Sequence, residues 1–310
     1  MTDLDPRDRA LLELLNWLSL RGYVFIAPTP ETHARNLKRR GGETARDVRD
    51  ALGWSMPFDP ATFEPEVVDL LSAAEALEPA DGGRTRSALR VASLEGLLLL
   101  HSAYPTQAAD AVFFGPDSYR FVRLIRDELA GVHPRRIVDV GTGSGVGGIA
   151  AGLLKPKAAI FLTDVNAEAL RLARVNAAFQ RLDATFLHGD GVEEVEGGFD
   201  LALLNPPYIQ DDDERLYRHG GALHGGQLSI DLARAVCERL DPGGRLILYT
   251  GTAIVGGGDR LREALAYECA GCTLRYRELD PDVFAEELDR PAYADVERIA
   301  VVAAVLTRTG

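Results

Sequence analysis

The sequence predicts an α/β protein in which a smaller, mainly helical N-terminal domain precedes a domain built on a parallel sheet. The chain has 310 residues, more than one compact domain usually holds, and its 46% hydrophobic content is ample for a packed core. Up to about Asp127 the apolar residues follow a mainly helical spacing. After Val132 a strand, a glycine turn and a helix recur, which is typical of a parallel sheet covered by helices.

The N-terminal domain is expected to span residues 1–110. Its first helix is predicted by leucines spaced to lie on one face, namely Leu11, Leu14, Leu15 and Leu18. Thr44-Ala-Arg-Asp47 resembles a capping box, so a helix is predicted over 44–53, and another over 65–77. Two strand-like runs, 87–93 and 96–102, predict a β-hairpin. Two helices followed by a hairpin is the order of a winged-helix module, which contacts nucleic acid or holds a protein partner.

The α/β domain is expected to span residues 111–310. Its strands are predicted at 136–140, 158–163, 184–187, 199–204, 244–251, 272–279 and 297–306. Its helices are predicted at 145–154, 166–179, 227–240 and 258–268. Pro281, Pro291 and an acidic stretch separate the last two strands, so no helical crossover is evident between them. These two strands are therefore predicted to form an antiparallel pair at one edge of the sheet.

The first strand of this domain runs into a glycine turn that predicts a cofactor site. Arg136-Ile-Val-Asp-Val140 is followed by Gly141-Thr-Gly-Ser-Gly145 and a helix of small residues. Glycines permit a tight turn and close backbone approach, and the helix N-terminus offers free N–H groups. Asp164, at the end of the second strand, is placed to hydrogen-bond a ribose diol. Asp190, after the third strand, is placed to bind an adenine amino group.

Two cofactors are compatible with this turn. Gly143-Ser-Gly145-Val-Gly-Gly148 matches the G-x-G-x-x-G fingerprint of dinucleotide-binding enzymes, with Asp164 as the acidic partner. S-adenosylmethionine is favoured by Asp139, whose carboxylate precedes the first glycine and is expected to meet the methionine ammonium directly or through water. A second, reactive-looking motif after the fourth strand also favours it, because dinucleotide dehydrogenases do not require such a motif.

That motif is Asn205-Pro-Pro-Tyr208, at the carboxyl end of a buried strand, where open α/β sheets bind ligands. Two prolines fix φ and remove two N–H donors, which leaves a rigid corner with carbonyl acceptors. The Asn205 side-chain oxygen and the Pro206 carbonyl are expected to accept the two N–H groups of a planar NH₂, so that its lone pair faces the sulfonium methyl. Tyr208 is expected to stack on the planar group and to add cation–π attraction. The sequence therefore predicts methylation of an amide or exocyclic amino nitrogen.

These motifs, in this order and spacing, resemble the release-factor glutamine N5-methyltransferase family and its relatives with a small methyltransferase domain. The resemblance covers roughly 110–310 and includes Thr163-Asp-Val-Asn166, Gly189-Asp190 and the glycine-bearing segment 220–226. It implies a Rossmann-like seven-stranded methyltransferase sheet and S-adenosyl-L-methionine as donor. The expected catalytic residues are Asn205, Pro206, Pro207 and Tyr208. The expected cofactor-binding residues are Asp139, Gly141, Thr142, Gly143, Gly145, Asp164, Val165, Asp190, Gly191 and Asn205.

Three parts of the chain bear on the substrate. Residues 1–110 do not resemble the helical domain that binds release factors, and Phe113-Phe-Gly-Pro-Asp-Ser118 echoes the family's proline-containing segment only loosely. Phe113 or Phe114 is expected to close over the cofactor, and at least one of them to pack in the core. The polar stretch from Gln210 to His219 is long enough for a mobile lid and equally compatible with a solvated loop.

Charge and composition narrow the partners. The net charge of −13 argues against broad attraction to nucleic-acid backbones. One cationic stretch, Arg35 to Arg49, holds six basic residues against two acidic ones and is either a solvated helix face or a binding patch. Cys269-Ala-Gly-Cys272 lacks the second ligand pair of a zinc site, so no metal is expected. No apolar run approaches the roughly 18 residues of a membrane helix, and a cytoplasmic protein is expected.

The expected function is an S-adenosylmethionine-dependent N-methyltransferase of a translation-associated macromolecule. A protein glutamine is the favoured acceptor, and a base amino group in rRNA, tRNA or DNA is the alternative. The nucleic-acid alternative predicts that Arg35–Arg49 and the hairpin lie beside Asn205. Two further interpretations are a winged-helix protein that senses the cofactor without catalysis and an NAD-type oxidoreductase.

Overall fold

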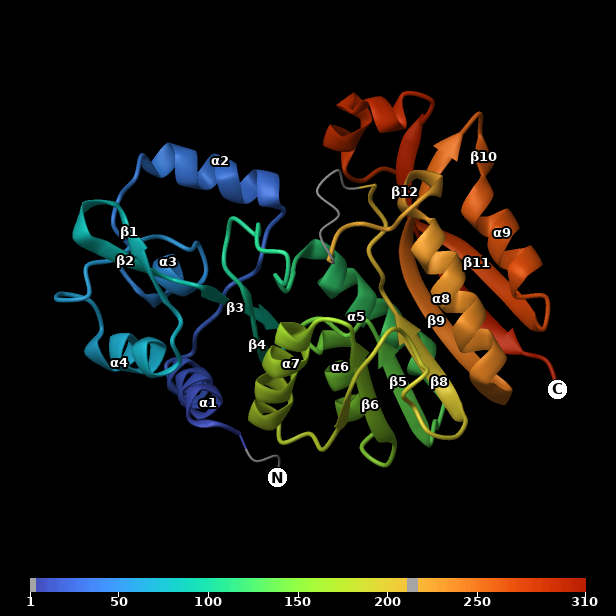
Figure 1. The fold of residues 1–310 in the computed structure, drawn as a ribbon, viewed down its shortest axis with the longest axis horizontal. Coiled ribbons are helices and arrows are strands. Elements are labelled where there is room, and N and C mark those ends of the chain that lie inside the picture. The colour runs from blue at the N-terminus through green and yellow to red at the C-terminus, as the bar shows by residue number, and fades with distance from the viewer. Residues whose placement is uncertain (1–3, 211–216) are drawn as a thin grey trace.

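The computed structural model describes residues 4–210 and 217–310 of the chain (Figure 1). The N-terminal portion, residues 4–110, contains four helices and two antiparallel strand pairs: α1 (Pro6–Leu20), α2 (Pro30–Arg40), α3 (Val48–Leu52), α4 (Pro65–Ala73), β1 (Leu77–Ala80), β2 (Arg84–Ser87), β3 (Leu89–Leu94) and β4 (Leu97–Ser102). The helices of the C-terminal portion, residues 111–310, are α5 (Pro116–Leu129), α6 (Val146–Leu154), α7 (Ala167–Phe179), α8 (Gln227–Arg239) and α9 (Arg260–Glu268). Its strands are β5 (Arg136–Val140), β6 (Ala159–Asp164), β7 (Thr185–His188), β8 (Phe199–Leu204), β9 (Leu240–Val255), β10 (Gly258–Asp259), β11 (Cys272–Asp280) and β12 (Arg298–Arg308).

Local signals explain where the N-terminal helices begin and end. The Asp5 side chain accepts a hydrogen bond from the Asp8 N–H, which caps α1. The prediction of a helix from residue 44 is wrong, because Asp47 and not Thr44 is the N-cap: its carboxylate accepts from the Asp50 N–H, and α3 begins at Val48. The predicted helix 65–77 is too long, since Glu75 has a φ of 54° and ends the helical path before β1.

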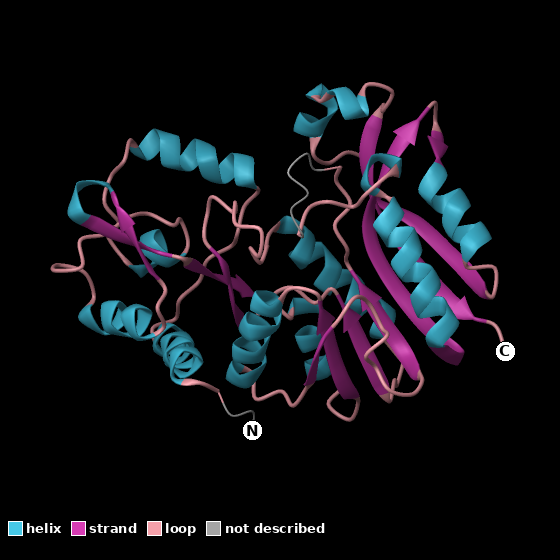
Figure 2. Cartoon of the chain, in the orientation of Figure 1, coloured by secondary structure: helices cyan, strands magenta, loops and turns pink. Residues whose placement is uncertain are grey.

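The C-terminal portion is built on one sheet with the order β7-β6-β5-β8-β9-β12-β11. Neighbouring strands from β7 to β9 are parallel, whereas β12 runs antiparallel to both β9 and β11. The predicted antiparallel pair at the sheet edge is confirmed. Strand β9 is longer than predicted, because it continues to Val255 and pairs there with β10. This is the Rossmann-like α/β arrangement with a preceding, mainly helical portion (Figure 2).

Both faces of the sheet are covered by helices. Helices α5, α6 and α7 bury residues such as Phe121, Ala151 and Ala173 against one face. Helices α8 and α9 bury residues such as Val236 and Leu265 against the other. The parallel strands β5, β6 and β8 finish at the same edge of the sheet, so a site at that edge rests on a core that helices cover on both faces.

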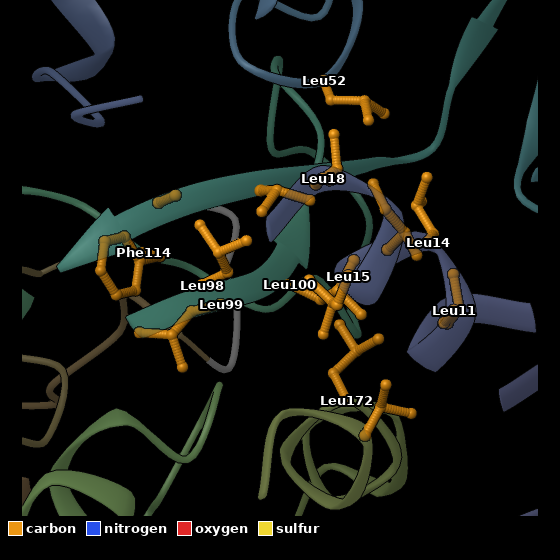
Figure 3. Packing of buried hydrophobic residues seen from close by; sticks show 14 of the residues in the cluster. Leu11, Leu14, Leu15, Leu18, Leu52, Leu98, Leu99, Leu100, Phe114 and Leu172 are labelled. Carbon is orange, nitrogen blue, oxygen red and sulfur yellow. The ribbon is translucent and has the colours of Figure 1, made fainter. Parts of the chain in front are cut away.

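The β3–β4 hairpin forms as predicted but lies inside the molecule. All six residues of β3 and the middle four of β4 are buried. Figure 3 shows Leu98–Leu100 of this hairpin in one cluster with the leucines of α1 and with Leu172 of α7. The hairpin is therefore a packing element between the two portions rather than a projecting wing. The winged-helix interpretation, which rested on this hairpin, stays a prediction.

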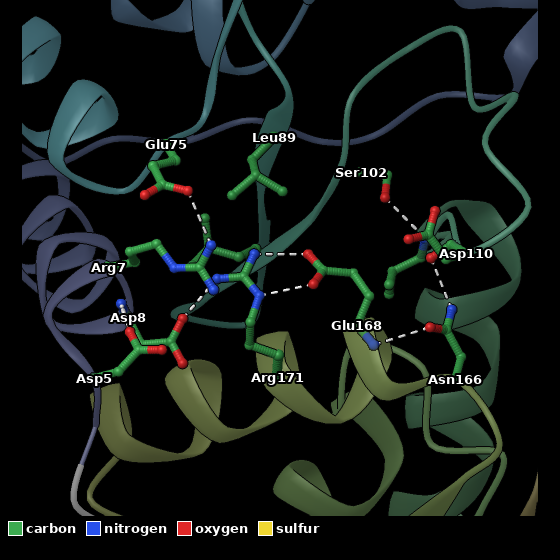
Figure 4. Close-up of polar contacts among 12 residues, drawn as sticks. Asp5, Arg7, Asp8, Glu75, Leu89, Ser102, Asp110, Asn166, Glu168 and Arg171 are labelled. Atoms are coloured by element: carbon green, nitrogen blue, oxygen red, sulfur yellow. Dashed lines mark hydrogen bonds and ion pairs between the residues drawn. The ribbon is translucent and has the colours of Figure 1, made fainter.

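Polar contacts also tie the two portions together (Figure 4). Arg171 of α7 donates to Asp8 of α1 at 2.6 Å and to Glu168 at 2.7 Å. The buried Asn176 side chain accepts from the Leu100 N–H at 2.8 Å and donates to the Leu100 carbonyl at 3.0 Å. It also donates to the Ser144 carbonyl at 2.9 Å. One amide side chain thus connects the hairpin, α7 and the glycine turn after β5.

Candidate active site

A cavity of about 230 Å³ opens at the carboxyl edge of β5, β6 and β8. The predicted site residues that line it are Asp139, Gly141, Thr142, Gly143, Asp164, Val165, Asp190, Gly191, Asn205, Pro206, Pro207 and Tyr208. Gly145 is not among its lining residues; it has a φ of 83° and begins α6, where an added methyl would lie 3.1 Å from the Ala173 Cβ. Its place in the structure is that of a turn and packing glycine.

The glycine turn follows the course that its sequence indicates. Gly141, Gly143 and Gly145 all have φ values between 54° and 83°, in the left-handed region that other residues rarely adopt. The Thr142 N–H donates to the Thr163 carbonyl at 3.0 Å, which holds the turn against the end of β6. Helix α6 starts directly after the turn, so its free N–H groups are directed toward the cavity edge.

Asp139 is buried beneath this turn and organises it. Its Oδ2 accepts from the Thr142 hydroxyl at 2.6 Å and from the Gly148 N–H at 2.7 Å. Burial raises the pKa of this carboxyl to about 6, although both hydrogen bonds act to lower the pKa. A methyl group at Gly147 would lie 3.0 Å from Oδ1 and 3.1 Å from Oδ2, so the carboxylate needs a residue without a side chain at this position. The carboxylate thus shapes the turn and lies among the residues that line the cavity.

Asp164 plays the corresponding part at the end of β6. Its Oδ2 accepts from the Gly143 N–H at 2.8 Å, and its Oδ1 accepts from the Asn166 N–H at 2.9 Å. Burial raises the pKa of Asp164, and the backbone donors oppose that shift. Each oxygen keeps a lone pair for a hydroxyl donor, as the prediction of a ribose contact requires. Val165, Leu228 and Leu232 add apolar surface to the same cavity.

The Asn205-Pro-Pro-Tyr208 corner is braced from behind by the glycine segment 220–226. The Gly220 N–H donates to the Ile209 carbonyl at 2.8 Å. A methyl group at Gly225 would lie 2.4 Å from the Tyr208 carbonyl oxygen, and at Gly220 it would lie 2.7 Å from the Pro207 carbonyl oxygen. Backbone packs on backbone here, which only residues without a side chain allow. This contact explains why a glycine-bearing segment follows the motif in the sequence.

Tyr208 is held by contacts that sequence inspection did not find. Its hydroxyl donates to Asp117 Oδ2 at 2.7 Å, and the Tyr249 hydroxyl donates to Asp117 Oδ1 at the same distance. Its ring packs on Gly251, where a methyl group would lie 2.2 Å from the ring. These partners come from α5 and β9 and are far from residue 208 in sequence, so only the fold could reveal them.

The walls of the cavity come from both portions of the molecule. Pro30, the first residue of α2, lines one side, and Phe284 lines it from the loop before β12. Phe113 lines the cavity and stacks on Tyr217 at 5.8 Å between ring centroids, whereas Phe114 is buried beside His101 and Tyr119. Of this pair, Phe113 is thus the one at the site. Residues 211–216 of the expected lid lie outside the described residues. Arg218 lines the cavity and pairs with Glu287.

The cationic stretch does not present its charges to the cavity. None of its six basic residues is among the lining residues. Arg40 makes a bidentate pair with Asp50 at 2.6 Å, and Arg46 contacts the same carboxylate. Arg35 pairs with Glu31, and Arg49 lies over the Phe25 ring. Most of this positive charge is therefore used inside the N-terminal portion, which supports a solvated helix face more than a binding patch.

The three cysteines, Cys237, Cys269 and Cys272, are free thiols. Within residues 4–210 and 217–310, no group of three or more His, Cys, Asp or Glu side chains is arranged to hold a metal ion. Across the same ranges, no helix combines the length and the apolar character needed to cross a bilayer.

Comparison with known proteins places this geometry in a family. The sequence profile of the methyltransferase small domain matches residues 121–252. A release factor glutamine methyltransferase of Bradyrhizobium diazoefficiens is 33% identical over 230 residues, which is 67% of this chain and 76% of that protein. The chain belongs to the S-adenosylmethionine-dependent methyltransferases with a small methyltransferase domain. S-adenosylmethionine, and not a dinucleotide, is the cofactor of this family, and the Asp139–Asp164 cradle fits it.

Two further relatives of this methyltransferase differ in how much of the chain they match. A release factor glutamine methyltransferase of Deinococcus radiodurans is 35% identical over 153 residues, which is 46% of this chain and 55% of the relative. A protein named ribosomal RNA small subunit methyltransferase C, from Pseudomonas entomophila, is 28% identical over 260 residues, which is 78% of this chain and 69% of the relative. The chain thus spans about half the length of the first of these relatives.

Proposed function

We propose that this protein transfers a methyl group from S-adenosylmethionine to a planar amide or amino nitrogen of a macromolecule, and that the acceptor is a glutamine side chain of a protein. The observation that carries the proposal is the shared cavity, which is lined both by the Asp139–Gly143 turn with Asp164 and by Asn205-Pro-Pro-Tyr208. A donor site and an acceptor site on one rigid sheet edge are what group transfer requires.

The donor side of the cavity binds S-adenosylmethionine. Asp139 attracts the ammonium group of the cofactor, because its carboxylate lines the cavity and the protein donors described for it reach Oδ2 alone. Asp164 accepts from ribose hydroxyls, and Asp190 accepts from the adenine amino group, with Val165 and Leu232 against the ring. The floor of the cofactor site is formed by Gly141, Thr142, Gly143 and Gly191. Gly145 contributes to cofactor binding through the turn that it forms. When bound, S-adenosylmethionine supplies an electrophilic methyl on a sulfonium.

The acceptor side aligns a weak nucleophile. An amide nitrogen shares its lone pair with the neighbouring carbonyl, so orientation is the main contribution that the protein makes. The Asn205 side-chain oxygen and the Pro206 carbonyl accept the two N–H groups, and Pro207 stiffens the corner. Tyr208 does not serve as the base, because its hydroxyl already donates to Asp117. The proton lost from nitrogen passes to solvent.

Charge and the relatives support a protein acceptor. The chain carries 47 acidic against 34 basic residues, and Arg35, Arg40 and Arg46 of the cationic stretch pair with carboxylates of the N-terminal portion. Such a surface attracts nucleic-acid backbones poorly. Two of the relatives described above are named release factor glutamine methyltransferases. The base amino group of an RNA is the second candidate, favoured by the relative named ribosomal RNA small subunit methyltransferase C, whose similarity extends over 78% of this chain.

Radiolabelled methyl transfer tests the proposal. Purified protein is incubated with S-[methyl-³H]adenosylmethionine and, in separate reactions, with release factors, ribosomal subunits and tRNA from a strain lacking the corresponding gene. Label in a polypeptide, located on a glutamine by peptide mass spectrometry, is the expected result. Label that survives proteinase and is lost with nuclease would move the assignment to nucleic acid. No label in any fraction, with cofactor binding intact, would support a sensor instead.

A further inference from the structure

We propose that Asp117 is a positioning residue for methyl transfer, and that its carboxylate fixes the Tyr208 ring in the orientation that meets the acceptor. The catalytic consequence of this inference rests on the proposed function, whereas the hold of Asp117 on the ring does not. Asp117 lies in the first turn of α5, which packs on the sheet near the carboxyl edge of β8 and β9.

The contact between the two residues is strong and shielded. Tyr208 is 7% exposed and Asp117 is 8% exposed, so little water competes for the 2.7 Å hydrogen bond between them. A hydrogen bond to a charged acceptor in such surroundings is stronger than one between neutral groups. Without the carboxylate, the phenol hydroxyl would be a buried donor with no partner, which is costly. The hydroxyl is therefore anchored at one point.

Asp117 is itself held from several directions. Its other oxygen accepts from the fully buried Tyr249 hydroxyl at 2.7 Å. Arg120 contacts Asp117 at 3.3 Å and Asp280 at 3.0 Å, which links the carboxylate to the end of β11. A carboxylate in the first turn of a helix is also favoured by the helix dipole. An anchor that is fixed in this way transmits its position to the ring it holds.

The ring has no room to turn away. Gly251 lies against it so closely that a methyl group there would be 2.2 Å from Cδ2 and 2.5 Å from Cε2. Phe284 packs against the ring at 5.8 Å between centroids and an angle of 67°. The hydroxyl anchor and the two packed sides leave the Tyr208 ring as a fixed wall of the cavity. Preorganisation of this kind reduces what must be ordered in the transition state.

The charge on Asp117 has a second effect on the ring. Burial, and then the neighbouring Asp117 charge, raise the pKa of the Tyr208 hydroxyl well above its usual range, so the phenol keeps its proton. The hydrogen bond from the hydroxyl to a carboxylate increases electron density in the ring, which strengthens the attraction of the ring for positive charge. The positive charge that develops on the acceptor nitrogen and the charge of the sulfonium would both meet this ring.

The first test follows the ring directly and needs no acceptor. 3-Fluorotyrosine is placed at position 208 of the full chain, and its ¹⁹F resonance is recorded with and without S-adenosylhomocysteine. A fixed ring gives a narrow signal, and Asp117→Ala is expected to broaden or split it. Tyr249→Phe is the matched control, because it removes the other 2.7 Å donor to the same carboxylate but leaves the Tyr208 hydrogen bond and the Arg120 contact that holds Asp117, and Tyr249 does not line the cavity. The control is expected to keep a narrow signal. An unchanged signal in Asp117→Ala would overturn the proposal.

The second test is a double-mutant cycle on kcat with the labelled acceptor. Asp117→Ala and Tyr208→Phe are each expected to lower kcat by about tenfold with little change in cofactor affinity, because alignment alone is lost. The double variant is expected to lose no more than about the larger single loss, since both changes remove one contact. Losses that multiply in the double variant would contradict the positioning role. If the wild type transfers no label, the proposed function fails, and the ¹⁹F signal alone decides the role of Asp117.

Discussion

Single buried carboxylates determine much of what this site can do, and Asp139 is the clearest example. It carries a charge beneath the glycine turn, yet the structure gives it only hydroxyl and backbone N–H partners. Its pKa is raised from 3.8 in the unfolded reference to about 6 in the fold. The folded protein therefore keeps a proton that the unfolded chain releases between pH 3.8 and about pH 6, so the cost of burying the charge grows over that range and is complete above about pH 6. A bound ammonium group would offset that cost.

Cofactor affinity is therefore expected to depend on pH through Asp139. Affinity should be highest where the carboxylate is charged and should fall as the pH drops through about 6. Calorimetric titration of S-adenosylmethionine from about pH 5 to about pH 8 measures this dependence. Asp139→Asn should bind the cofactor more weakly and with little pH dependence. A variant that kept the wild-type pH profile would show that another group titrates.

Asn205 and Asp164 are expected to divide the work between acceptor and donor. Asn205→Ala should lower turnover by about a hundredfold or more and leave cofactor affinity nearly unchanged, because the amide is assigned chiefly to aligning the acceptor. Asp164→Ala should weaken cofactor binding most, since it removes the acceptor from the cavity and releases the Gly143 N–H. Calorimetry and labelled methyl transfer are measured on the same preparations. Equal losses of cofactor affinity in both variants would refute this division.

At the scale of elements, residues 220–226 pack behind Asn205-Pro-Pro-Tyr208, so a side chain in this segment is expected to lower turnover. Gly225→Ala forces a methyl group to within 2.4 Å of the Tyr208 carbonyl oxygen and should displace the corner. Turnover is expected to fall by about tenfold or more, because misplacement by about 1 Å is enough to do so. Gly221→Ala is the control, since Gly221 also has a positive φ, of 79°, but only the Gln227 Cβ lies nearby, at 3.5 Å. Similar kcat losses in both would point to backbone strain rather than contact with the motif.

The elements also show what a sequence can predict. Every predicted strand of the parallel sheet exists within a few residues of its predicted bounds, because alternation and glycine turns are local signals. The predicted start of α3 is wrong because both Thr44 and Asp47 are suitable N-cap residues, and in the structure Asp47 is the N-cap. Asp117, Tyr249 and Gly251 could not be assigned to the site, because their meeting with Tyr208 depends on how α5 and β9 pack.

For the whole molecule, the decisive feature is one hydrophobic cluster shared by both portions. Leu11, Leu14 and Leu18 of α1 belong to the same cluster as Leu172 and Val175 of α7 (Figure 3). The division into two domains, residues 1–110 and 111–310, stays a proposal, and the first domain is expected to recognise the substrate. Because the cluster crosses that boundary, the two parts are expected to unfold together.

Leu172→Ala tests this cooperativity. The change empties part of a fully buried site and should cost about 2–5 kcal/mol. Both tryptophans of the chain, Trp17 and Trp54, lie in the N-terminal portion. Their fluorescence should therefore report the same lowered midpoint as far-UV circular dichroism. Leu153→Ala, at a position that is 42% exposed, is the control and should shift neither signal appreciably. Separate midpoints for the two signals would show two independent units.

The side-chain amide of Asn176 couples the backbone N–H of Leu100 to the loop that forms the donor site. The Leu100 N–H is held by Asn176 Oδ1, and the same side chain donates to the Ser144 carbonyl beside the cavity. Any ligand that rigidifies the loop after β5 must then slow deuterium uptake at Leu100, although that residue does not line the cavity. Saturation with S-adenosylhomocysteine should reveal this slowing in the wild type and not in Asn176→Ala.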